Sequence, residues 1–354
     1  MAKMKIAIIG CGTIANSAHI PAYMKNEEVE IKYFCDILLH KAEKCVEKYG
    51  CGTAVEDYHV VLNDPEIEAV SVCTPNKQHA FITIDALKAG KNVLCEKPAA
   101  RVYSEALAMQ QAQHESGKVL NIGVVNRFNS AVNRLREIIQ SGDLGEIYHV
   151  YVCFRSQRSI PGLGGAFTTK EISGGGVLID WGVHYLDIVM YCTGDPKATS
   201  VSAKAYSKLG VDMPNYVYEG MWAEDTKDLN GTYDVDDFVT GFVRTSGPTI
   251  TFNGAWAQNL GVNESYIDFL GTKGGARLNY GGDFTVYTTS CGSLVNFKPK
   301  YKDEPMFQKE IDGFINCIKT GEKLPSHIDT VIKTAEMMQA MYDSSESGKE
   351  IILG

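Results

Sequence analysis

The first 123 residues alternate short, uniformly apolar runs with longer amphipathic stretches. The apolar runs lack the alternation of a half-exposed strand, so they predict buried parallel strands. These runs are Ile6–Ile9, Ile31–Cys35, Ala69–Cys73, Asn92–Cys95 and Val119–Ile122. The amphipathic stretches predict helices at Ile14–Lys25, Lys41–Tyr49, Ala80–Ala89 and Ser104–Ser116. Such a βαβα order is typical of an α/β fold with a doubly wound parallel sheet.

After Gly123 the pattern changes to that of an α+β domain. A helix is predicted at Ala131–Gln140, and two more, Met306–Lys319 and Ile328–Tyr342, close the chain. Strand-like segments occur at Ile147–Phe154, Thr199–Lys204, Phe238–Arg244, Thr249–Trp256, Tyr266–Leu270 and Phe284–Tyr287. Strands that follow one another without intervening helices predict a large, mostly antiparallel open sheet. We therefore expect one domain at residues 1–123 and a second at residues 124–354.

Residues 206–234 interrupt the run of predicted strands and are rich in Tyr, Gly, Asp and Asn. Three roles are open to this excursion: a lid, an oligomer contact or a plain insertion.

Length and charge agree with two globular domains and disfavour some partners. At roughly 150 residues per domain, 354 residues make about two domains. The 34 basic and 43 acidic side chains give a formal charge of −9. With no Lys/Arg-rich run, this balance disfavours nucleic acid and anionic membranes as partners. No apolar stretch approaches the roughly 18 residues of a membrane span.

Ten cysteines are scattered along the chain without a CxxC pair or zinc-finger spacing. Several lie inside apolar runs, as in Val72-Cys73 and Leu94-Cys95, where a free cysteine behaves as a small hydrophobic residue. We interpret them as reduced core residues of a cytoplasmic protein.

A glycine-rich turn, Gly10-Cys-Gly12-Thr-Ile-Ala15, joins the first predicted strand to the first helix. Gly10 permits the tight turn, Gly12 lets backbone N–H groups approach a pyrophosphate, and Ala15 allows close helix packing. Asp36 ends the next strand, where a carboxylate accepts hydrogen bonds from ribose hydroxyls and repels a 2′-phosphate. The pattern favours NAD over NADP, against the alternative of a plain glycine turn with an incidental surface Asp. The candidate cofactor contacts here are Gly10, Gly12, Thr13, Ile14 and Asp36.

Two further strings lie where a doubly wound sheet binds ligands, at the carboxyl ends of strands. They are Cys73-Thr74-Pro75-Asn76, followed by His79, and Glu96-Lys97-Pro98. Together with the glycine turn they resemble the Gfo/Idh/MocA family of oxidoreductases, named for glucose-fructose oxidoreductase and inositol dehydrogenase. The resemblance spans the whole chain, through Asn126-Arg127-Phe128, the string from Gly174 to Asp187, and Gly271-Thr-Lys-Gly274.

This resemblance implies an N-terminal Rossmann domain, a C-terminal domain for substrate and oligomerisation, and a cis Lys97-Pro98 bond. It implies that the cofactor cleft is lined by Thr74, Pro75, Asn76, His79, Glu96, Lys97 and Asn126. It also implies a homo-oligomer, a homodimer or homotetramer, because the family commonly pairs its open sheets face to face.

A predicted helix from Val177 to Cys192 carries Asp180, His184 and Asp187 at i, i+4 and i+7, one polar stripe on an apolar element. Such burial is costly unless the stripe faces a wet site, and the alternative is a solvated surface stripe. Beside Lys97, the stripe suggests alcohol oxidation. His184 is the natural general base, Lys97 a donor to the alcohol oxygen, and Asp180 orients the substrate or the Lys/His pair. We expect no metal, because lysine and histidine already supply electrophile and base.

The substrate is less clearly indicated. The candidate contacts are Lys97, Arg127, Arg158, Asp180, His184 and Trp256. Arg155 and Arg158 could equally form salt bridges, and Trp181 and Trp256 could be core residues. We expect a polyol: a pyranose, a glycoside or an inositol, with a sugar phosphate or sugar acid open because of the arginines.

Three classes of function are therefore considered. The first is a dehydrogenase that oxidises a secondary alcohol of a sugar, glycoside or inositol to a ketone and exchanges NAD with solvent. The second is a redox-neutral enzyme with tightly bound NAD, which hydrolyses glycosides through oxidation and elimination or couples two sugars. The third is a non-enzymatic NAD(P)-binding sensor, which has no need of Lys97, Asp180 and His184.

Overall fold

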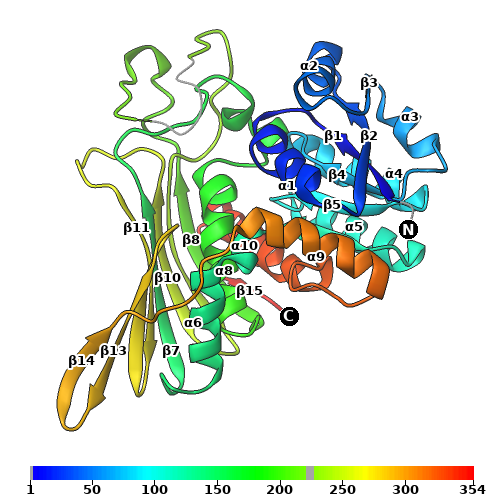
Figure 1. The fold of residues 1–354 in the computed structure, drawn as a ribbon. Helices are drawn as coiled ribbons and strands as arrows, with labels where there is room; N and C mark the ends of the chain where they lie inside the picture. Colours follow the sequence, from blue (N-terminus) through cyan, green and yellow to red (C-terminus); the bar gives the residue numbers. More distant parts are fainter. Residues whose placement is uncertain (1–2, 221–226) are drawn as a thin grey trace. The chain divides into compact units, whose positions relative to one another are not determined.

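The computed structural model describes residues 3–220 and 227–354, which form two compact units (Figure 1). The first unit comprises Met1–Phe128 and Pro305–Ile332, and the second comprises Asn129–Glu304 and Lys333–Gly354. A single cut after residue 123 therefore does not describe the packing, because a late segment of the chain belongs with the first unit.

The first unit contains a parallel sheet with the strand order β3-β2-β1-β4-β5-β6. Its strands are β1 (Met4–Ile9), β2 (Val29–Cys35), β3 (Thr53–Val55), β4 (Ala69–Val72), β5 (Asn92–Glu96) and β6 (Leu120–Gly123). Every neighbouring pair is parallel, which confirms the predicted doubly wound sheet. The sequence pattern missed β3, because its three residues are only partly buried and form no apolar run.

Helices connect these strands. A π-helical turn, η1 (Ala15–His19), leads into α1 (Ile20–Lys25), and the others are α2 (Leu39–Tyr49), α3 (Tyr58–Asn63), α4 (Asn76–Lys88) and α5 (Tyr103–Ser116). The chain moves outward from β1 to β2 in one direction and from β4 to β5 in the other. The carboxyl ends of β1 and β4 are therefore the topological switch point, where doubly wound sheets bind their ligands.

Helix α9 (Met306–Thr320) packs on the first unit, although it lies late in the sequence. Its apolar residues Ile311, Phe314 and Ile315 share a buried core with β1 and α1. The chain after α9 then lies along β6, where the N–H of Ile122 donates to the carbonyl of Ser326 at 2.9 Å. The sequence pattern identifies this helix but does not indicate which domain its apolar face covers.

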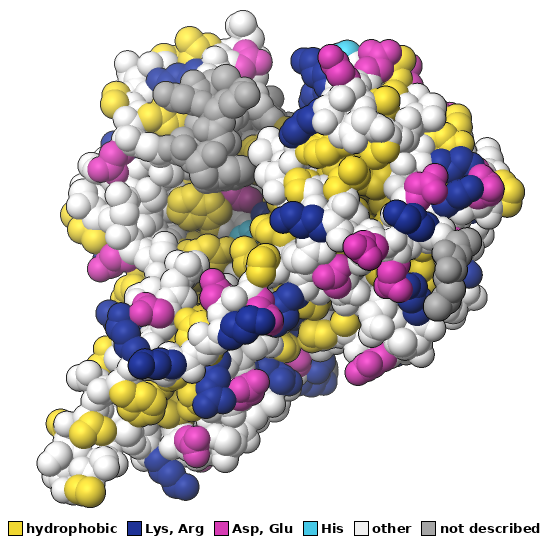
Figure 2. Space-filling model, viewed as in Figure 1, with side chains coloured by type: hydrophobic (Ala, Val, Ile, Leu, Met, Phe, Trp, Pro, Cys, Tyr) yellow, Lys and Arg dark blue, Asp and Glu magenta, His cyan; other side chains and the backbone are white. Residues whose placement is uncertain are grey.

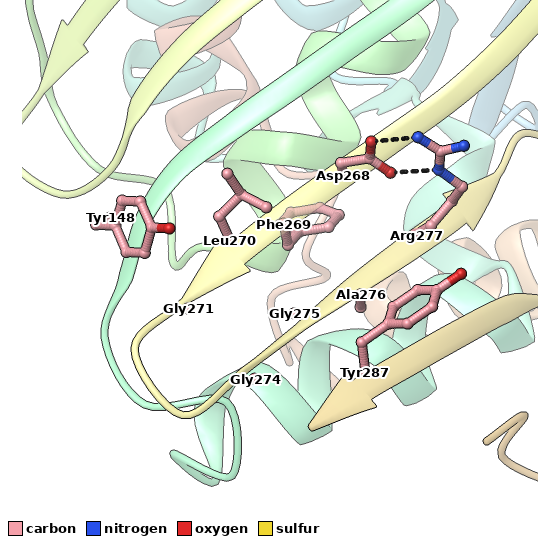
Figure 3. A pocket seen from close by; sticks show the side chains of 10 residues that line it. All are labelled: Tyr148, Asp268, Phe269, Leu270, Gly271, Gly274, Gly275, Ala276, Arg277 and Tyr287. Atoms are coloured by element: carbon pink, nitrogen blue, oxygen red, sulfur yellow. Dashed lines mark hydrogen bonds and ion pairs between the residues drawn. The ribbon is translucent and has the colours of Figure 1, made fainter. Parts of the chain in front are cut away.

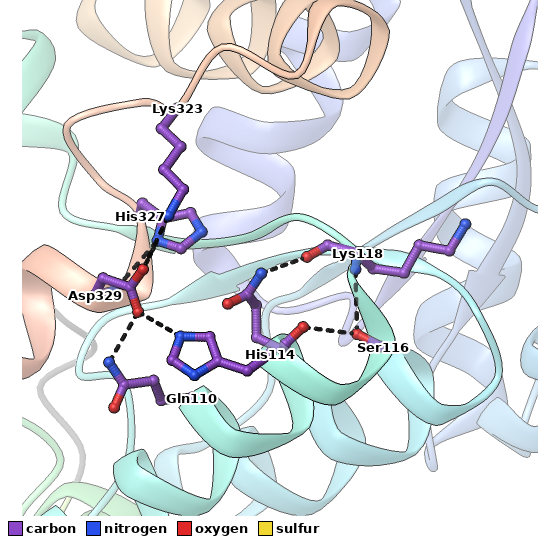
Figure 4. Close-up of polar contacts among 8 residues, drawn as sticks. Gln110, His114, Ser116, Lys118, Lys323, His327 and Asp329 are labelled. Atoms are coloured by element: carbon purple, nitrogen blue, oxygen red, sulfur yellow. Dashed lines mark hydrogen bonds and ion pairs between the residues drawn. The ribbon is translucent and has the colours of Figure 1, made fainter.

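The carboxylate of Asp329 fixes this returning segment to α5 (Figure 4). It accepts hydrogen bonds from Gln110 at 2.8 Å, from His114 at 2.9 Å and from Lys323 at 3.1 Å. Burial raises the pKa of Asp329, but these hydrogen bonds outweigh it and hold the pKa well below its ordinary value. The carboxylate is therefore charged at neutral pH and joins α5 to the start of α10 (Ile328–Ser347).

In the described residues of the second unit, the sheet has the order β14-β13-β12-β11-β7-β10-β9-β8-β15. Its strands are β7 (Ile147–Arg155), β8 (Ala198–Tyr206), β9 (Phe238–Thr245), β10 (Thr249–Ala255), β11 (Glu264–Gly271), β12 (Gly274–Asn279), β13 (Phe284–Ser290), β14 (Ser293–Phe297) and β15 (Ile351–Ile352). Neighbours are antiparallel except β7 and β10, which run parallel. The predicted open, mostly antiparallel sheet is thus confirmed, whereas the glycine-rich β12 and the exposed β14 were not foreseen.

Helices cover one face of this sheet (Figure 1). They are α6 (Ser130–Gln140), α8 (Val183–Cys192) and the later part of α10. A short helix, α7 (Lys170–Ser173), precedes α8 in the chain. Val150 and Ile250 from the sheet, Leu186 from α8 and Met337 from α10 share one buried core. Along the central strands, residues that point toward the helices are buried and many of the alternate residues are more exposed, so in the described part of this unit the second face of the sheet is the more exposed one.

The 206–234 excursion is partly described, since residues 221–226 lie outside the described residues. Its described part includes the 3-10 turn η5 (Met213–Asn215), and Tyr216 is buried in the core. The other 3-10 turns are η2 (Val125–Phe128) and η3 (Ala166–Thr168).

All ten cysteines are free thiols. Within the described residues, each helix is too short or too polar to traverse a bilayer.

Candidate functional site

The glycine turn after β1 has the shape that a phosphate-binding turn requires. Gly10 has a φ of +94°, and a Cβ at this position would lie 2.6 Å from the carbonyl carbon of Cys73 at the end of β4. Only glycine tolerates both the dihedral angle and this close approach. A Cβ on Gly12 would meet nothing within 4 Å, so the space beside its backbone is open to a ligand.

Asp36 is held at the mouth of this turn. One carboxylate oxygen accepts from the N–H of Cys11 at 2.9 Å, and the other accepts from the N–H of Leu38 at 2.9 Å. Each oxygen of a carboxylate can accept a second hydrogen bond. The side chain is therefore fixed in direction and still able to bind the two hydroxyls of a ribose.

Thr74 follows β4 and faces the same edge of the sheet. Its hydroxyl oxygen is buried and has no hydrogen-bond partner among the described residues. A buried hydroxyl without a partner is unfavourable, so this atom is suited to a polar ligand group. Lys97-Pro98, after the next strand, is a cis peptide bond, as the family resemblance implied.

His79 is buried and joins the loop after β4 to the loop after β5. Its Nδ1 lies 2.7 Å from the carbonyl oxygen of Pro98, and its Nε2 lies 2.8 Å from that of Thr74. Two carbonyl acceptors require a proton on both ring nitrogens, so the side chain is an imidazolium. Burial lowers the pKa of His79, but the Cys95 thiol and the two carbonyls outweigh it and raise the pKa to about 9. Because His79 is fully buried, the expectation that it lines the cofactor cleft is corrected: it positions Thr74 and Pro98.

Glu96 takes part in a second buried network behind Lys97. One of its oxygens lies 2.8 Å from Nε2 of His19, and the other accepts from the N–H of Lys97 at 3.0 Å. His19 also contacts Ser71, whose hydroxyl lies 2.8 Å from that of Tyr23. Burial raises the pKa of Glu96, but the hydrogen bond and charge of His19, together with the charge and backbone N–H of Lys97, outweigh it and leave the pKa below its ordinary value. Glu96 is therefore a charged group that fixes the backbone of Lys97.

Residues of η2 have a structural role that the sequence did not indicate. Asn126 and Arg127 are both buried. The guanidinium of Arg127 donates to the carbonyl of Pro325 at 2.9 Å, which joins η2 to the chain that returns after α9. Arg127 is thus corrected from a candidate substrate contact to a packing residue, because its side chain is buried and bonded to the chain that returns after α9.

The second unit carries Asp180 and His184 on a helix whose first turn is π-helical, η4 (Leu178–Gly182), followed by α8. Asp180 is buried, and His184 is half-buried with its ring 6.2 Å from that of Tyr280. Asp187, the third member of the predicted stripe, is enclosed and accepts from Thr334 of α10 at 3.2 Å. Of the three residues of the stripe, Asp180 and His184 therefore stay candidates for the site, whereas Asp187 has a structural role. Single π turns inside helices occur frequently at functional sites.

The remaining substrate candidates differ in exposure. Trp256 lies wholly within the core and presents no ring face to a ligand, so its candidate role in stacking is corrected. Arg155 forms an ion pair with Glu264, the salt bridge considered as its alternative. Arg158 is half-buried, lies over the ring of Tyr216, and donates weakly to the carbonyl of Gln258 at 3.4 Å. Trp181 is half-buried against the core.

Comparison with known proteins identifies the family. Residues 4–124 match the oxidoreductase family with an NAD-binding Rossmann fold, and residues 132–277 match the GFO/IDH/MocA C-terminal domain. The D-glucoside 3-dehydrogenase of Escherichia coli (strain K12) is 31% identical over 353 residues, which cover 99% of this chain and 97% of that protein. This chain belongs to the Gfo/Idh/MocA family.

Solved structures share the fold across the whole chain. The aldose-aldose oxidoreductase from Caulobacter crescentus matches with a TM-score of 0.82 at 23% identity and covers 99% of this chain and 100% of its own. Levoglucosan dehydrogenase, in complex with NADH and L-sorbose, matches with a TM-score of 0.86 at 22% identity and full coverage of both chains. At these identities the likeness shows the fold alone.

This Gfo/Idh/MocA protein is an NAD-dependent oxidoreductase, which confirms the cofactor and enzyme class expected from the sequence. Its first unit fits the cofactor physically. The open space beside Gly12 suits a pyrophosphate, the fixed carboxylate of Asp36 suits a ribose, and the unpartnered hydroxyl of Thr74 suits a further polar contact.

The sequence did not indicate several residues that lie near Glu96, near His184 or at the start of the helix that carries Asp180. They are His19, Ser71, Tyr23 and Glu310 in the first unit, and Tyr280 and Asp236 in the second. Glu310, on α9, is buried, and this burial together with the charge of Glu96 raises its pKa well above the ordinary value. No local pattern marks such residues, because each acts on a segment distant in sequence.

His79 is expected to make stability depend on alkaline pH. Its folded-state pKa lies above the unfolded value of about 6.5, so its contribution is complete below that value and is lost as pH rises through about 9. His79→Gln leaves one carbonyl without a donor and should cost about 1–3 kcal/mol at pH 7. Urea unfolding at several pH values should show a smaller loss between pH 7 and 10 in the variant. An exposed control, His59→Gln, should follow the wild type, and parallel curves for all three proteins would contradict the assignment.

Asp36 should determine the preference for NAD. Asp36→Ser removes the repulsion of a 2′-phosphate and the acceptors for two hydroxyls, so NAD affinity should fall about 10-fold to 100-fold and the preference over NADP should largely vanish. Fluorescence titration with NADH and NADPH measures both affinities. Glu47→Ser removes an exposed charge of α2 and serves as the control. Equal binding of NADH and NADPH by the wild type would refute the argument.

Proposed function

We propose that this protein oxidises a secondary hydroxyl of a pyranose ring, and that the 3-hydroxyl of a glucoside is the first candidate. The observation that carries the proposal is the full-length relative named D-glucoside 3-dehydrogenase, which aligns with nearly the whole of both domains. Inositols and free sugars belong to the same class of secondary alcohols and are the next candidates.

In the proposed mechanism, His184 accepts the hydroxyl proton at its imidazole, because histidine is the side chain most often used as a general base. The ammonium of Lys97 donates a hydrogen bond to the same oxygen and stabilises the developing alkoxide. Asp180, one turn before His184 on the same helix, orients the substrate or the Lys/His pair. When bound, NAD supplies the hydride acceptor.

The surroundings of these groups support the assignment. Lys97 is half-buried at the end of β5, and its backbone is fixed by Glu96, which is itself paired with His19. In the second unit, the ring of Tyr280 beside His184 is stacked on Tyr185 at 4.4 Å. Arg158 stays a proposed substrate contact.

The test is a survey of substrates with the purified protein. Methyl glucosides, free aldoses and inositols are supplied with NAD, and the absorbance of NADH is followed while the product is analysed for a ketone at a ring carbon. We expect turnover with a glucoside and a 3-keto product. NAD that copurifies, with sugar conversion but no net NADH, would instead indicate the redox-neutral class.

We also propose a homo-oligomer, a dimer or tetramer, formed through the outer face of the nine-stranded sheet. Exposed rings on this face include Tyr148, Tyr151 and Tyr287, and Leu294 of β14 is 91% exposed. Figure 2 shows hydrophobic side chains on the projecting β13–β14 hairpin, at lower left. A single sheet layer with this many exposed apolar groups is better suited to a protein contact than to water.

A shallow hollow of about 390 Å³ lies on the same face (Figure 3). Tyr148 and Tyr287 line it, and Arg277 forms a two-pronged pair with Asp268 at 2.6 Å for each hydrogen bond. Because these two charges satisfy one another, neither is left unpaired when the hollow is covered. We further propose a cytoplasmic location, which the free thiols of all ten cysteines support.

Loss of either proposed catalytic group should reduce turnover. Lys97→Ala and His184→Ala should each lower kcat about 100-fold or more with NADH affinity nearly unchanged, because the glycine turn and Asp36 hold the cofactor separately. Steady-state kinetics and NADH titration measure the two effects. The exposed His59→Ala serves as a control, and wild-type turnover in His184→Ala would refute its assignment as the base.

Charge on the outer face should disrupt assembly. Tyr151→Lys combined with Tyr287→Lys places cations among the exposed rings and should shift the protein toward the monomer mass of 38.8 kDa. Light scattering after gel filtration at micromolar concentration measures the mass. Leu107→Lys, on exposed α5, should leave it unchanged, and a monomeric wild type would contradict the proposal.

A further inference from the structure

The helix that carries Asp180 and His184 has no side-chain cap at its own N-cap position. That position is occupied by Val177, which is apolar. The first N–H groups of a helix have no acceptor within the helix and need one when they are buried. Here the acceptors come from Asp236, which is 60 residues from Gly176 and 58 from Leu178.

Asp236 binds three consecutive N–H groups. One carboxylate oxygen accepts from Gly176 at 2.8 Å, and the other accepts from Leu178 at 3.0 Å. Its backbone carbonyl accepts from Val177 at 3.0 Å. Asp236 is buried, so water does not compete for these N–H groups. An acidic side chain also interacts favourably with the dipole at a helix N-terminus.

Tyr342 of α10 completes the contact, and together with Asp236 it explains the glycine run. Its hydroxyl donates to Asp236 at 2.9 Å. A Cβ on Gly175 would lie 2.1 Å from the hydroxyl oxygen of Tyr342, and a Cβ on Gly176 would lie 1.9 Å from the carbonyl oxygen of Asp236. The chain before the helix can therefore approach these two residues only because it lacks side chains there.

The first turn transmits this contact to Asp180. The N–H of Asp180 donates to the carbonyl of Gly176 at 3.0 Å, so one hydrogen bond separates it from the residue that Asp236 holds. We propose that Asp236, supported by Tyr342, is a positioning residue that fixes where this helix begins and hence where Asp180 and His184 lie. The effect on turnover rests on the proposed function, whereas the contact itself does not.

The neighbouring residue provides a matched control. Asp237 is also buried, and one oxygen of its carboxylate accepts three backbone N–H groups, from Lys208 at 2.8 Å, Leu209 at 2.5 Å and Gly210 at 2.9 Å. These belong to the start of the 206–234 excursion and not to the helix. Asp236→Asn and Asp237→Asn therefore remove the same charge from equally buried sites and loosen different segments.

The first measurement is amide hydrogen exchange of the full-length variants without substrate. In Asp236→Asn the amide nitrogen replaces one acceptor, so exchange should become faster in peptides that cover 174–184. In Asp237→Asn the faster exchange should appear in peptides that cover 206–216. Tyr342→Phe keeps both N–H acceptors of Asp236, so it should raise exchange at 174–184 to a lesser degree. Unchanged exchange at 174–184 in both Asp236→Asn and Tyr342→Phe would overturn the inference.

The second measurement is steady-state kinetics well below the unfolding temperature of each variant. Asp236→Asn should lower kcat about 10-fold to 100-fold, because small displacements of reacting groups have effects of that size. NADH affinity should not change, and Asp237→Asn should keep kcat within about threefold of the wild type. Retained kcat in Asp236→Asn, or an equal loss in both variants, would overturn the positioning role. If Asp236→Asn does not fold, Tyr342→Phe carries both measurements, with a smaller loss of kcat expected.

The two proposals fail in different ways. If wild-type protein reduces NAD with none of the sugars and inositols, the proposed function fails, and hydrogen exchange still decides whether Asp236 holds the helix. If the wild type is active and Asp236→Asn is equally active despite faster exchange, the proposed function stands and the positioning inference fails.

Discussion

Gly10 brings the end of β1 so close to the end of β4 that a single Cβ would overlap the backbone of Cys73. This contact lies at the topological switch point, where β1 and β4 are neighbours and their connections diverge. It brings the glycine turn, Asp36 on the adjoining strand, and the Thr74 loop to one edge of the sheet. The glycine turn, Asp36 and Thr74, which we expect to contact the cofactor, depend on this close approach, because each of them follows one of these three strands.

Ionisable side chains hold the loops and the helix that carry the proposed site residues. Asp36 accepts from the N–H groups of Cys11 and Leu38. His79 donates to the carbonyls of Thr74 and Pro98. Glu96 accepts from the N–H of Lys97. In the second unit, Asp236 does the same for the helix of Asp180 and His184. In each case backbone groups that would otherwise lack partners are satisfied by the side chain. Leaving such groups unpaired costs about 1–3 kcal/mol each, so these loops are strongly fixed.

The second unit uses its sheet in two different ways. The inner face packs against α6, α8 and the later part of α10, and so carries the helix of Asp180 and His184 on a rigid support. The outer face combines exposed rings with paired charges, such as Arg277 with Asp268. One layer of strands thereby supports the helix of the proposed catalytic residues on one side and carries the proposed oligomer contact on the other.

The sequence by itself determined the two fold classes, the glycine turn, the NAD preference expected from Asp36 and the family, because these depend on local periodicity and short motifs. It also identified Lys97, Asp180 and His184 as candidates. Tertiary structure alone showed that α9 belongs with the first unit, that Trp256 and Arg127 are enclosed, and that Asp187 pairs with Thr334. It alone revealed His79 as a buried bridge and Asp236 as the cap of a helix 58 residues away. The physical reason is that periodicity reports which side of an element is apolar, whereas the partner of a buried polar group is set by packing between segments that are distant in sequence.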